Sequence, residues 1–225
     1  MKNLYNKFLS IYKQFYYYDL KYSLLLGREY ELIYAFMKVY NDAILNVSIN
    51  TNDAIDILDN FKTNFVDEYT LRLDNIFDDK IVVDEIDIDE TEIFEILKST
   101  DDMWEEFIQS NNLLSKDTDA IYHKVLLIEV NNFFSHIISS IDDKNKSTDN
   151  HKRANSHLYR ACIDGYKEIL NEYSKHICAN KTIRDDFLTT RILEGSLIGH
   201  KSQKEKMNIV QGYKDISNNL VSIYQ

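Results

Sequence analysis

Apolar residues recur at intervals of three and four along most of the chain, the spacing that places them on one face of an α-helix. In the first such segment, residues 4–26, this face consists of Leu4, Phe8, Ile11, Phe15, Tyr18, Tyr22 and Leu25. The spacing predicts further helices over 28–47, 54–73, 117–141, 150–179, 183–198 and 203–224, with shorter helical stretches between 93 and 108. Thr51 or Asn52 is the expected N-cap of the third helix. The sequence therefore predicts an all-α fold, an antiparallel bundle of about seven to nine helices.

The pattern changes between residues 78 and 92, where Ile86 and Ile88 alternate with carboxylates. A period of two is typical of a strand with one buried face. This segment is expected to form either a short edge strand or an ordered acidic linker near residues 80–90. The run 142–150 is polar throughout, which makes it the candidate boundary or loop.

The composition agrees with long helices, because the chain has no proline and only 5 glycines. No stretch approaches the roughly 18 consecutive apolar residues of a membrane span, and the first residues do not resemble a signal peptide, so we expect a cytoplasmic protein without membrane contact. Cys162 and Cys178 lie in one predicted helix, about 24 Å apart, too far for a disulfide. Both are expected to pack as small apolar side chains.

Charge is unevenly distributed along the chain. Residues 1–143 contain 12 Lys and Arg against 28 Asp and Glu, whereas residues 144–214 contain 14 against 8. This contrast predicts an acidic helical region, 1–143, and a basic helical region, 144–225, either as two parts or as one continuous domain. A basic protein partner is expected at the acidic region, and RNA or a nucleotide at residues 144–214.

One face of the predicted helix after residue 150 is a polar stripe of Arg153, His157, Arg160, Asp164 and Lys167. The opposite face, expected in the core, consists of Leu158, Ala161, Cys162, Gly165 and Ile169. The stripe either faces water, as charged helix faces ordinarily do, or forms a site.

The site interpretation depends on chemistry. Arg153 and His157 lie one turn apart, which puts a fixed cation beside an imidazole that exchanges protons near neutral pH. Cleavage of RNA by its own 2′-hydroxyl requires a proton-transfer group and a positive charge at the phosphate. In this hypothesis Arg160 and Asp164 support the pair by forming an ion pair four residues apart.

The segment 152–161, which contains this pair, resembles the Arg, polar spacer, His motif of HEPN proteins, small all-helical domains common in prokaryotic toxin–antitoxin and phage-defence systems. The resemblance implies a motif at a dimer cleft and a metal-independent ribonuclease, with Arg153 as the motif arginine and His157 as the motif histidine. The family usually has four to six residues between the two, and this chain has three. Counting from Lys152 restores four but replaces arginine with lysine, which lacks the planar fork. A non-catalytic relative fits the residues as well.

Other candidate sites are weaker. The carboxylates of 84–92 lack the spacing of a calcium loop, and no His and Cys set has zinc-finger spacing, so we expect neither a metal nor a cofactor. Anion or RNA contacts would come from basic residues of the C-terminal third. These are Lys152, Lys167, Arg184, Arg191 and Lys201.

The favoured interpretation is a helical interaction or regulatory subunit of a multi-component prokaryotic system of the toxin–antitoxin or phage-defence type. A protein partner is expected, and a homodimer is a second form of assembly. One alternative is a HEPN-like metal-independent ribonuclease that uses Arg153 and His157. The other is binding of a nucleotide or small anion without catalysis.

Overall fold

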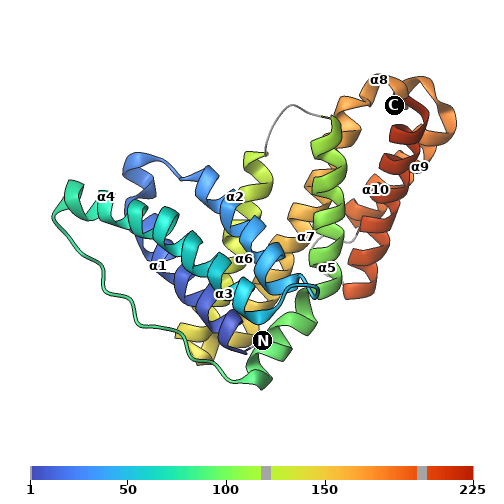
Figure 1. Cartoon of the computed structure of the whole chain (residues 1–225). Helices are drawn as coiled ribbons and strands as arrows, with labels where there is room; N and C mark the ends of the chain where they lie inside the picture. The colour runs from blue at the N-terminus through green and yellow to red at the C-terminus, as the bar shows by residue number, and fades with distance from the viewer. Residues whose placement is uncertain (1, 118–122, 197–201, 225) are drawn as a thin grey trace. The chain divides into compact units, whose positions relative to one another are not determined.

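A computed structural model describes residues 2–117, 123–196 and 202–224, and these residues contain helices and no strand. The predicted all-α fold is confirmed. The α-helices are α1 (Lys2–Leu26), α2 (Tyr30–Val39), α3 (Thr51–Phe61), α4 (Asp67–Phe77), α5 (Glu90–Asp117), α6 (Lys124–Asp142), α7 (Ser147–Glu172), α8 (Ser174–Ala179), α9 (Lys181–Ser196) and α10 (Gln203–Tyr224) (Figure 1). Two π-helical segments follow α2 and α3, namely η1 (Tyr40–Leu45) and η2 (Lys62–Val66), and a 3-10 turn, η3 (Lys144–Lys146), precedes α7.

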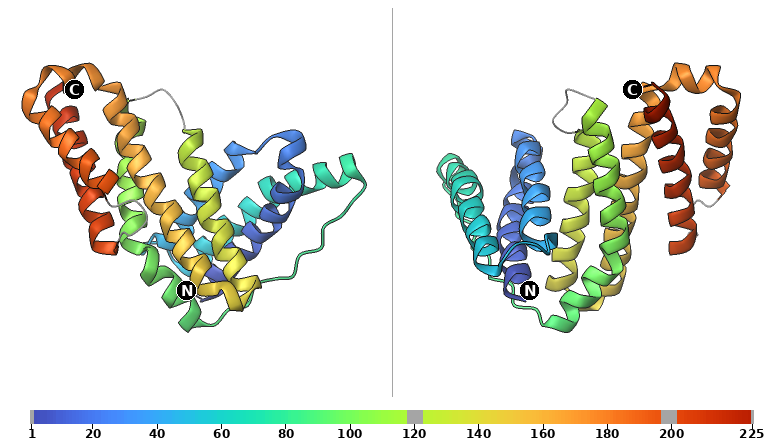
Figure 2. Two further views of the ribbon diagram at one scale, coloured as in Figure 1. Left: turned by 180° about the vertical axis from the view of Figure 1, so that it is seen from behind. Right: turned by 45° about the vertical axis from the view of Figure 1, so that its right-hand side comes forward.

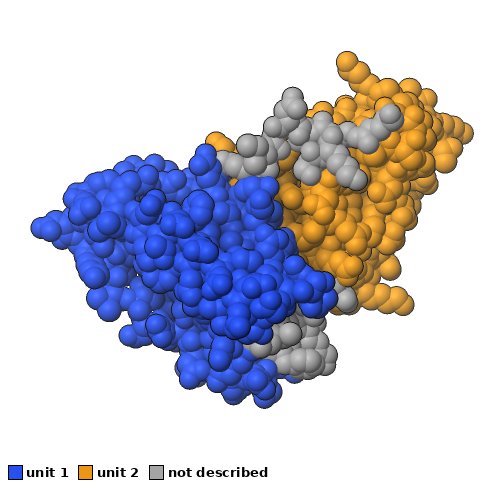
Figure 3. All heavy atoms as spheres, viewed as in Figure 1, with its two compact units in different colours: residues 1–99, 130–154 blue, residues 100–129, 155–225 orange. Residues whose placement is uncertain are grey.

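The chain divides into two compact units (Figure 3). The first consists of residues 1–99 and 130–154, and the second of residues 100–129 and 155–225. The division passes through α5, α6 and α7, so each of these helices contributes to both units. It does not coincide with the change in charge at residue 143, which lies inside the first unit.

Several helix ends differ from the predictions for local reasons. The stretches between 93 and 108 belong to one helix, α5, of 28 residues. The long helix predicted over 150–179 is interrupted at Tyr173, between α7 and α8. The N-cap of α3 is Asn50, whose extended backbone lets its side chain accept hydrogen bonds from the N–H groups of Asn52 and Asp53. The polar run 142–150 is mostly helical, because Asp143 caps the 3-10 turn η3 and α7 begins immediately after it.

The core of the first unit is aromatic, and Phe36 lies at its centre. The ring of Phe36 contacts the rings of Phe8, Tyr12, Phe15 and Phe61, at centroid distances of 6.1, 5.1, 5.2 and 4.7 Å. All five side chains are buried. Because these rings come from α1, α2 and α3, edge-to-face packing of aromatic residues joins the first three helices.

Three apolar residues of the helices predicted over 4–26, 28–47 and 54–73 are exposed. They are Leu25, Val47 and Phe65, at 71%, 97% and 52%. Leu25 lies in the last turn of α1. Phe65 lies in a π-helical segment and Val47 lies just after one. The helix ends at Leu45, because Asn46 has an extended backbone, so Val47 lies beyond it. A π-turn contains more residues than an α-turn, so it places Phe65 off the face that a regular helix would bury.

The acidic segment between α4 and α5 is an ordered linker, and the edge-strand alternative is wrong. It runs as an extended chain without strand pairing (Figure 2). Asn6 of α1 donates to the carbonyl of Ile88 at 3.1 Å and accepts from its N–H at 3.3 Å, and the N–H of Ile86 donates to the hydroxyl of Ser10 at 2.8 Å. Both isoleucines are buried. Side chains of α1 therefore satisfy the backbone groups that a neighbouring strand would otherwise pair.

The second unit buries the predicted apolar face of α7, and Leu158, Ala161, Cys162, Gly165 and Ile169 are all buried. Both cysteines are free, as expected, but only Cys162 is buried and Cys178 is exposed. The exposure of Cys178 corrects the prediction for that residue. It follows from the break after α7, which places Cys178 on the short helix α8.

Gly165 lies where α5 and α6 pack closely against α7. A Cβ atom there would lie 2.7 Å from the hydroxyl oxygen of Ser110 in α5 and 3.1 Å from a methyl carbon of Leu126 in α6. We predict that Gly165→Ala lowers the free energy of unfolding by about 1–3 kcal/mol, because the helices must separate to admit the methyl group. Urea denaturation followed by circular dichroism measures this change.

Gly195, in the last turn of α9, is the matched control because a Cβ there meets nothing within 4 Å. Gly195→Ala is expected to leave stability unchanged or to raise it by up to about 1 kcal/mol, the helix-propensity difference. Equal effects of the two substitutions would contradict the close packing described for Gly165.

Candidate functional site

The polar stripe predicted from the sequence lies on one unbroken helix, since α7 is continuous from Ser147 to Glu172. Its first member, Arg153, belongs to the first unit, and the other four belong to the second. Arg153 is exposed and forms no ion pair with any residue that the structure describes. The helix is thus unbroken along the whole stripe, as predicted. Side-chain contacts show which residues of the stripe form a cluster.

His157, Arg160 and Glu129 form that cluster within the second unit. Nδ1 of His157 lies 2.6 Å from Oε2 of Glu129, and Nε of Arg160 donates to the same oxygen at 3.0 Å. The side chains of His157 and Glu129 are 15% and 16% exposed, whereas that of Arg160 is 46% exposed. Glu129, on α6, therefore neutralises the arginine and orients the imidazole.

The position of the His157 proton follows from which groups donate hydrogen bonds and which accept them. Nη2 of Arg160 lies against the imidazole, 2.5 Å from Nδ1 and 3.2 Å from Nε2. A guanidinium only donates hydrogen bonds and a carboxylate only accepts them. The Nδ1 proton is therefore assigned to the bond with Glu129. Nη2 of Arg160 is closer to Nδ1 than to Nε2, so the guanidinium lies against the face of the ring and does not meet the in-plane lone pair of Nε2.

Glu129 is ionised in this cluster. Burial by itself would raise its pKa, but the hydrogen bonds from His157 and Arg160 together hold the pKa below its ordinary value. Helical spacing around His157 does not predict Glu129, because Glu129 lies 28 residues earlier on another helix. One signal was available, because Glu129 is the only acidic residue between positions 120 and 141 of a strongly apolar helix. A lone carboxylate in such a helix requires a partner.

The predicted ion pair between Arg160 and Asp164 does not form. Arg160 pairs with Glu129, and Asp164 lies 3.9 Å from the ammonium group of Lys167. Burial raises the pKa of Asp164, and the positive charge of Lys167 opposes this effect. Asp164 therefore does not hold Arg160 in place beside His157, the role that the sequence spacing predicted for it.

A second cluster surrounds Glu194 of α9. Oε1 of Glu194 accepts from Lys167 at 2.8 Å, and Oε2 accepts from Arg191 and from the hydroxyl of Tyr213, both at 2.5 Å. Burial raises the pKa of Glu194, and the hydrogen bonds from Lys167 and Tyr213 outweigh burial, so the net shift is downward. Lys167 and Arg191, two of the predicted anion-binding residues, are thus paired with one carboxylate.

Lys167 and Arg191 also border a hollow of about 450 Å³ in the second unit. Apolar side chains from α7, α8 and α9 line its interior, among them Leu170, Ile177 and Phe187. Glu194 already neutralises part of the positive charge at this rim. The hollow therefore offers an apolar surface with a weak positive edge, and its affinity for a small anion is reduced accordingly.

The remaining predicted anion-binding residues are not brought together. Arg184 is exposed and donates to the carbonyl of Cys178 at 3.1 Å. Lys152 is exposed, belongs to the first unit and lies 3.9 Å from Asp149. Lys201 lies outside the described residues. The five basic residues therefore do not form one patch in the described part of the chain.

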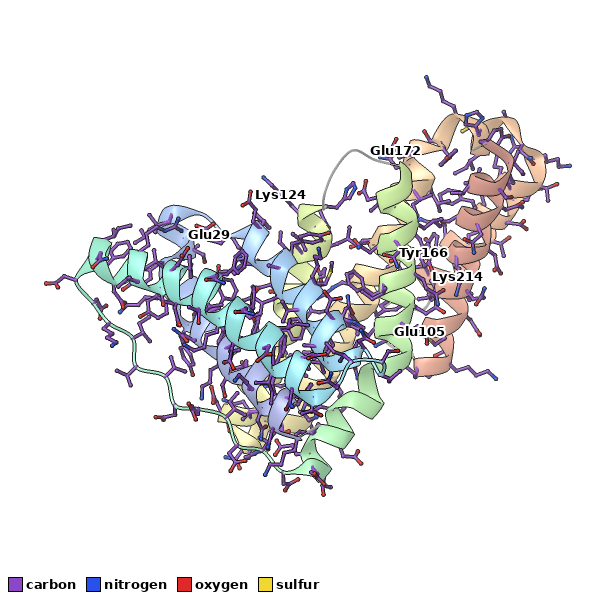
Figure 4. All side chains as sticks on the ribbon, viewed as in Figure 1. Glu29, Glu105, Lys124, Tyr166, Glu172 and Lys214 are labelled. Atoms are coloured by element: carbon purple, nitrogen blue, oxygen red, sulfur yellow. The ribbon has the colours of Figure 1, made fainter. Side chains whose placement is uncertain are left out.

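The net charge of the second unit is close to balanced. It contains 12 Lys and Arg against 15 Asp and Glu, whereas the first contains 14 against 22. Acidic residues of α5 and α6 account for this balance. For example, Glu106 of α5 accepts from Lys214 at 2.9 and 3.0 Å and from Tyr166 at 3.4 Å. Figure 4 labels the two donor residues, Tyr166 and Lys214. Acidic residues of α5 and α6 thus neutralise the part of the predicted basic region that belongs to the second unit.

Among residues 2–117, 123–196 and 202–224, no helix combines the length and the apolar composition of a bilayer-spanning segment. Within the same residues, His, Cys, Asp and Glu side chains form no group of three or more that could hold a metal ion. Comparison of the chain with protein-family models, with characterised proteins and with solved structures gives no match.

The contacts of Glu129 lead to a stability prediction. Glu129→Gln is expected to lower the free energy of unfolding by about 1–3 kcal/mol at about pH 7, because a charged acceptor shared by two donors is lost. A carboxyl with a lowered folded-state pKa stabilises the fold above its unfolded-state pKa and loses this contribution as pH falls through the folded-state value. The difference between wild type and variant should therefore shrink in acid, which urea denaturation at about pH 7 and about pH 4 measures.

Glu172→Gln is the matched control, because Glu172 is exposed at the end of α7, the helix that contains His157 and Arg160 (Figure 4). This substitution is expected to change stability by less than about 0.5 kcal/mol at either pH. An equal loss in both variants would mean that Glu129 has no special role in holding His157 and Arg160.

Proposed function

We propose that this chain is a non-catalytic binding protein that recognises a basic segment of a partner protein. In this proposal it acts in the cytoplasm as an interaction subunit of a prokaryotic system of the toxin–antitoxin or phage-defence type. The observation that carries the proposal is the ordered row of exposed carboxylates on the linker between α4 and α5.

The linker presents its charges on a fixed backbone. Asp84, Glu85 and Asp87 are exposed, while Ile86 and Ile88 are buried against α1. The sequence contains no Lys or Arg from residue 81 to residue 97. In the fold, Lys2 pairs with Asp87 at 3.1 Å, whereas Asp84 and Glu85 form no ion pair with a described residue. A charged surface that is already ordered attracts an oppositely charged partner and loses little conformational entropy on binding.

The polar stripe of α7 supports binding better than catalysis. A general base must offer a nitrogen to the proton that it removes from the substrate. In His157, Glu129 engages Nδ1, and the guanidinium of Arg160 lies against the ring. These contacts hold the side chains of α7 and α6 in place and leave the imidazole only 15% exposed.

The linker proposal predicts the behaviour of a triple variant, Asp84→Asn, Glu85→Gln and Asp87→Asn. With a fluorescent peptide of alternating lysine and leucine as the probe, wild-type protein is expected to bind in a salt-sensitive manner, because exposed charges are screened within roughly 8 Å at physiological ionic strength. The triple variant should bind about tenfold more weakly or worse. Fluorescence anisotropy at low and moderate salt measures both effects.

A second triple variant removes the same number and kind of charges from other positions of the first unit. It combines Asp42→Asn, Asp56→Asn and Glu68→Gln, at exposed residues outside the linker. Affinity close to that of wild type is expected. If both triple variants lose the same affinity, the peptide senses only net charge and the linker is no docking surface.

The second candidate function is a HEPN-like ribonuclease, and one observation favours it. Arg153 is exposed, without an ion pair to any described residue, one turn before His157 on a continuous helix. A cation in that position is available to a phosphate, and the family resemblance implies that a second copy would complete the cleft. In this function a bound RNA would displace Arg160 from the imidazole.

The two functions differ in a cleavage assay. As a non-catalytic protein, purified wild-type chain should leave a structured RNA intact in the presence of a chelator. Ribonuclease activity would instead require cleavage that His157→Ala and Arg153→Ala each reduce by at least about 100-fold, the range of a lost acid or base. His176→Ala, at an exposed histidine of α8, is the control that should retain any such activity. Cleavage that is equal in all variants would come from a contaminant.

A further inference from the structure

A cavity of about 400 Å³ lies within the first unit, between α1 and the part of α6 that belongs to this unit. This volume is in the range of small-molecule sites. From α1 and the residues that follow it, Asp19, Leu20, Leu24 and Arg28 line the cavity. The facing side of α6 contributes mainly small polar side chains, such as Ser135 and Ser139.

Asp19 is the unusual member of this lining. Its side chain is 4% exposed, yet its Oδ1 atom has no hydrogen-bond partner among the described residues. Burying a carboxylate oxygen without a donor is costly. Burial raises the pKa of Asp19, and the charge of Arg28 and the amide of Asn131 only oppose this effect. One oxygen of a buried acid thus requires a donor from outside the described contacts.

Arg28 supplies the opposite charge in the same cavity. Gly27, with a φ of 85°, ends α1 in the left-handed conformation that glycine adopts readily, and Arg28 then reaches back to Asp19. Its Nε lies 3.4 Å from Oδ2 of Asp19. No hydrogen bond within the described residues uses the two terminal nitrogens of Arg28, and the side chain is 28% exposed. The N–H groups of these two nitrogens are therefore available to donate hydrogen bonds to a bound anion.

We propose that the first unit binds a small zwitterion, a free α-amino acid with an apolar side chain, in this cavity. Its ammonium group donates to Oδ1 of Asp19, and its carboxylate accepts from the terminal nitrogens of Arg28. Both charged groups of the ligand then meet a side chain of opposite sign, which accounts for the unpaired acceptor and the unused donors together.

The apolar part of the ligand has a surface to contact. Leu20 and Leu24 border the cavity with exposures of 59% and 95%. Covering them with an apolar side chain removes hydrocarbon surface from water. Simple ions fit less well, since a cation at Asp19 is repelled by Arg28 and an anion at Arg28 is repelled by Asp19.

This site is independent of the linker surface proposed above. The residues that line the cavity belong to α1, the residue Arg28 after it and α6, and none of them belongs to the linker. A negative result in either experiment therefore leaves the other proposal standing.

The test is isothermal titration calorimetry of the full chain with L-leucine and two analogues, each of which lacks one charge. N-acetyl-L-leucine has no ammonium group and L-leucinol has no carboxylate. L-Leucine is expected to bind saturably, and each analogue about tenfold more weakly or worse, because each leaves one charged side chain unpaired. Absence of binding by L-leucine, or equal binding of all three compounds, would overturn the proposal.

Variants assign the contacts to residues. Asp19→Asn and Arg28→Gln should each weaken L-leucine binding by about tenfold or more. Asp79→Asn, which removes a carboxylate paired with Lys21 of α1 outside the cavity, and Arg184→Gln, in the second unit, should bind as wild type does. If circular dichroism shows that Asp19→Asn is unfolded, the proposal is tested by Arg28→Gln and by the two analogues. If Arg28→Gln binds L-leucine as tightly as wild type does, Arg28 does not bind the ligand carboxylate and the zwitterion proposal is wrong.

Discussion

The attachment of Tyr12 to α6 is the interaction on which the first unit depends. Its ring packs against Phe134 at 5.0 Å, and its hydroxyl lies 2.9 Å from the carbonyl of Asn131 and 2.8 Å from the side-chain oxygen of the same residue. A buried tyrosine thus contributes both apolar contact and a satisfied polar group. The position of α1 against α6 follows from it.

That position matters because α1 serves two surfaces. Near its beginning, Asn6 and Ser10 hold the backbone of the acidic linker. Near its end, Asp19 and the following Arg28 line the cavity beside α6. The contacts of Tyr12 thus help to fix the helix that holds the linker near its beginning and lines the cavity near its end.

The second unit differs from the first, because several of its acidic side chains form ion pairs, whereas carboxylates of the linker are exposed. Glu106, Glu129 and Glu194 each accept from at least two donors, and their side chains are all about 15% exposed. Networks in which the acceptors are well satisfied at low dielectric order the side chains that they join. The half-buried part of the α7 stripe thus supports packing, while the exposed Arg153 is left outside these networks.

Much of the fold was predictable from local pattern. The buried face of α7, from Leu158 to Ile169, follows from helical spacing, and so does the last helix, which matches the predicted range 203–224. The π-helical segments were not predictable, because the spacing of apolar residues around Val47 and Phe65 is that of a regular helix. Their exposure depends on a change in backbone hydrogen bonding that side-chain periodicity does not encode.

The candidate site shows the same limit. Spacing along one helix placed Arg153, His157 and Arg160 on one line, which is a local property of the sequence. Which of them would meet a partner depended on Glu129, 28 residues earlier, and on how α6 packs beside α7. The sequence by itself thus determined the all-α class, most of the helices, the buried face of α7 and the distribution of charge along the chain. Only the tertiary structure decided which charges neutralise one another and that Asp19 would be buried with one oxygen unpaired, because those contacts join residues that are distant in the chain.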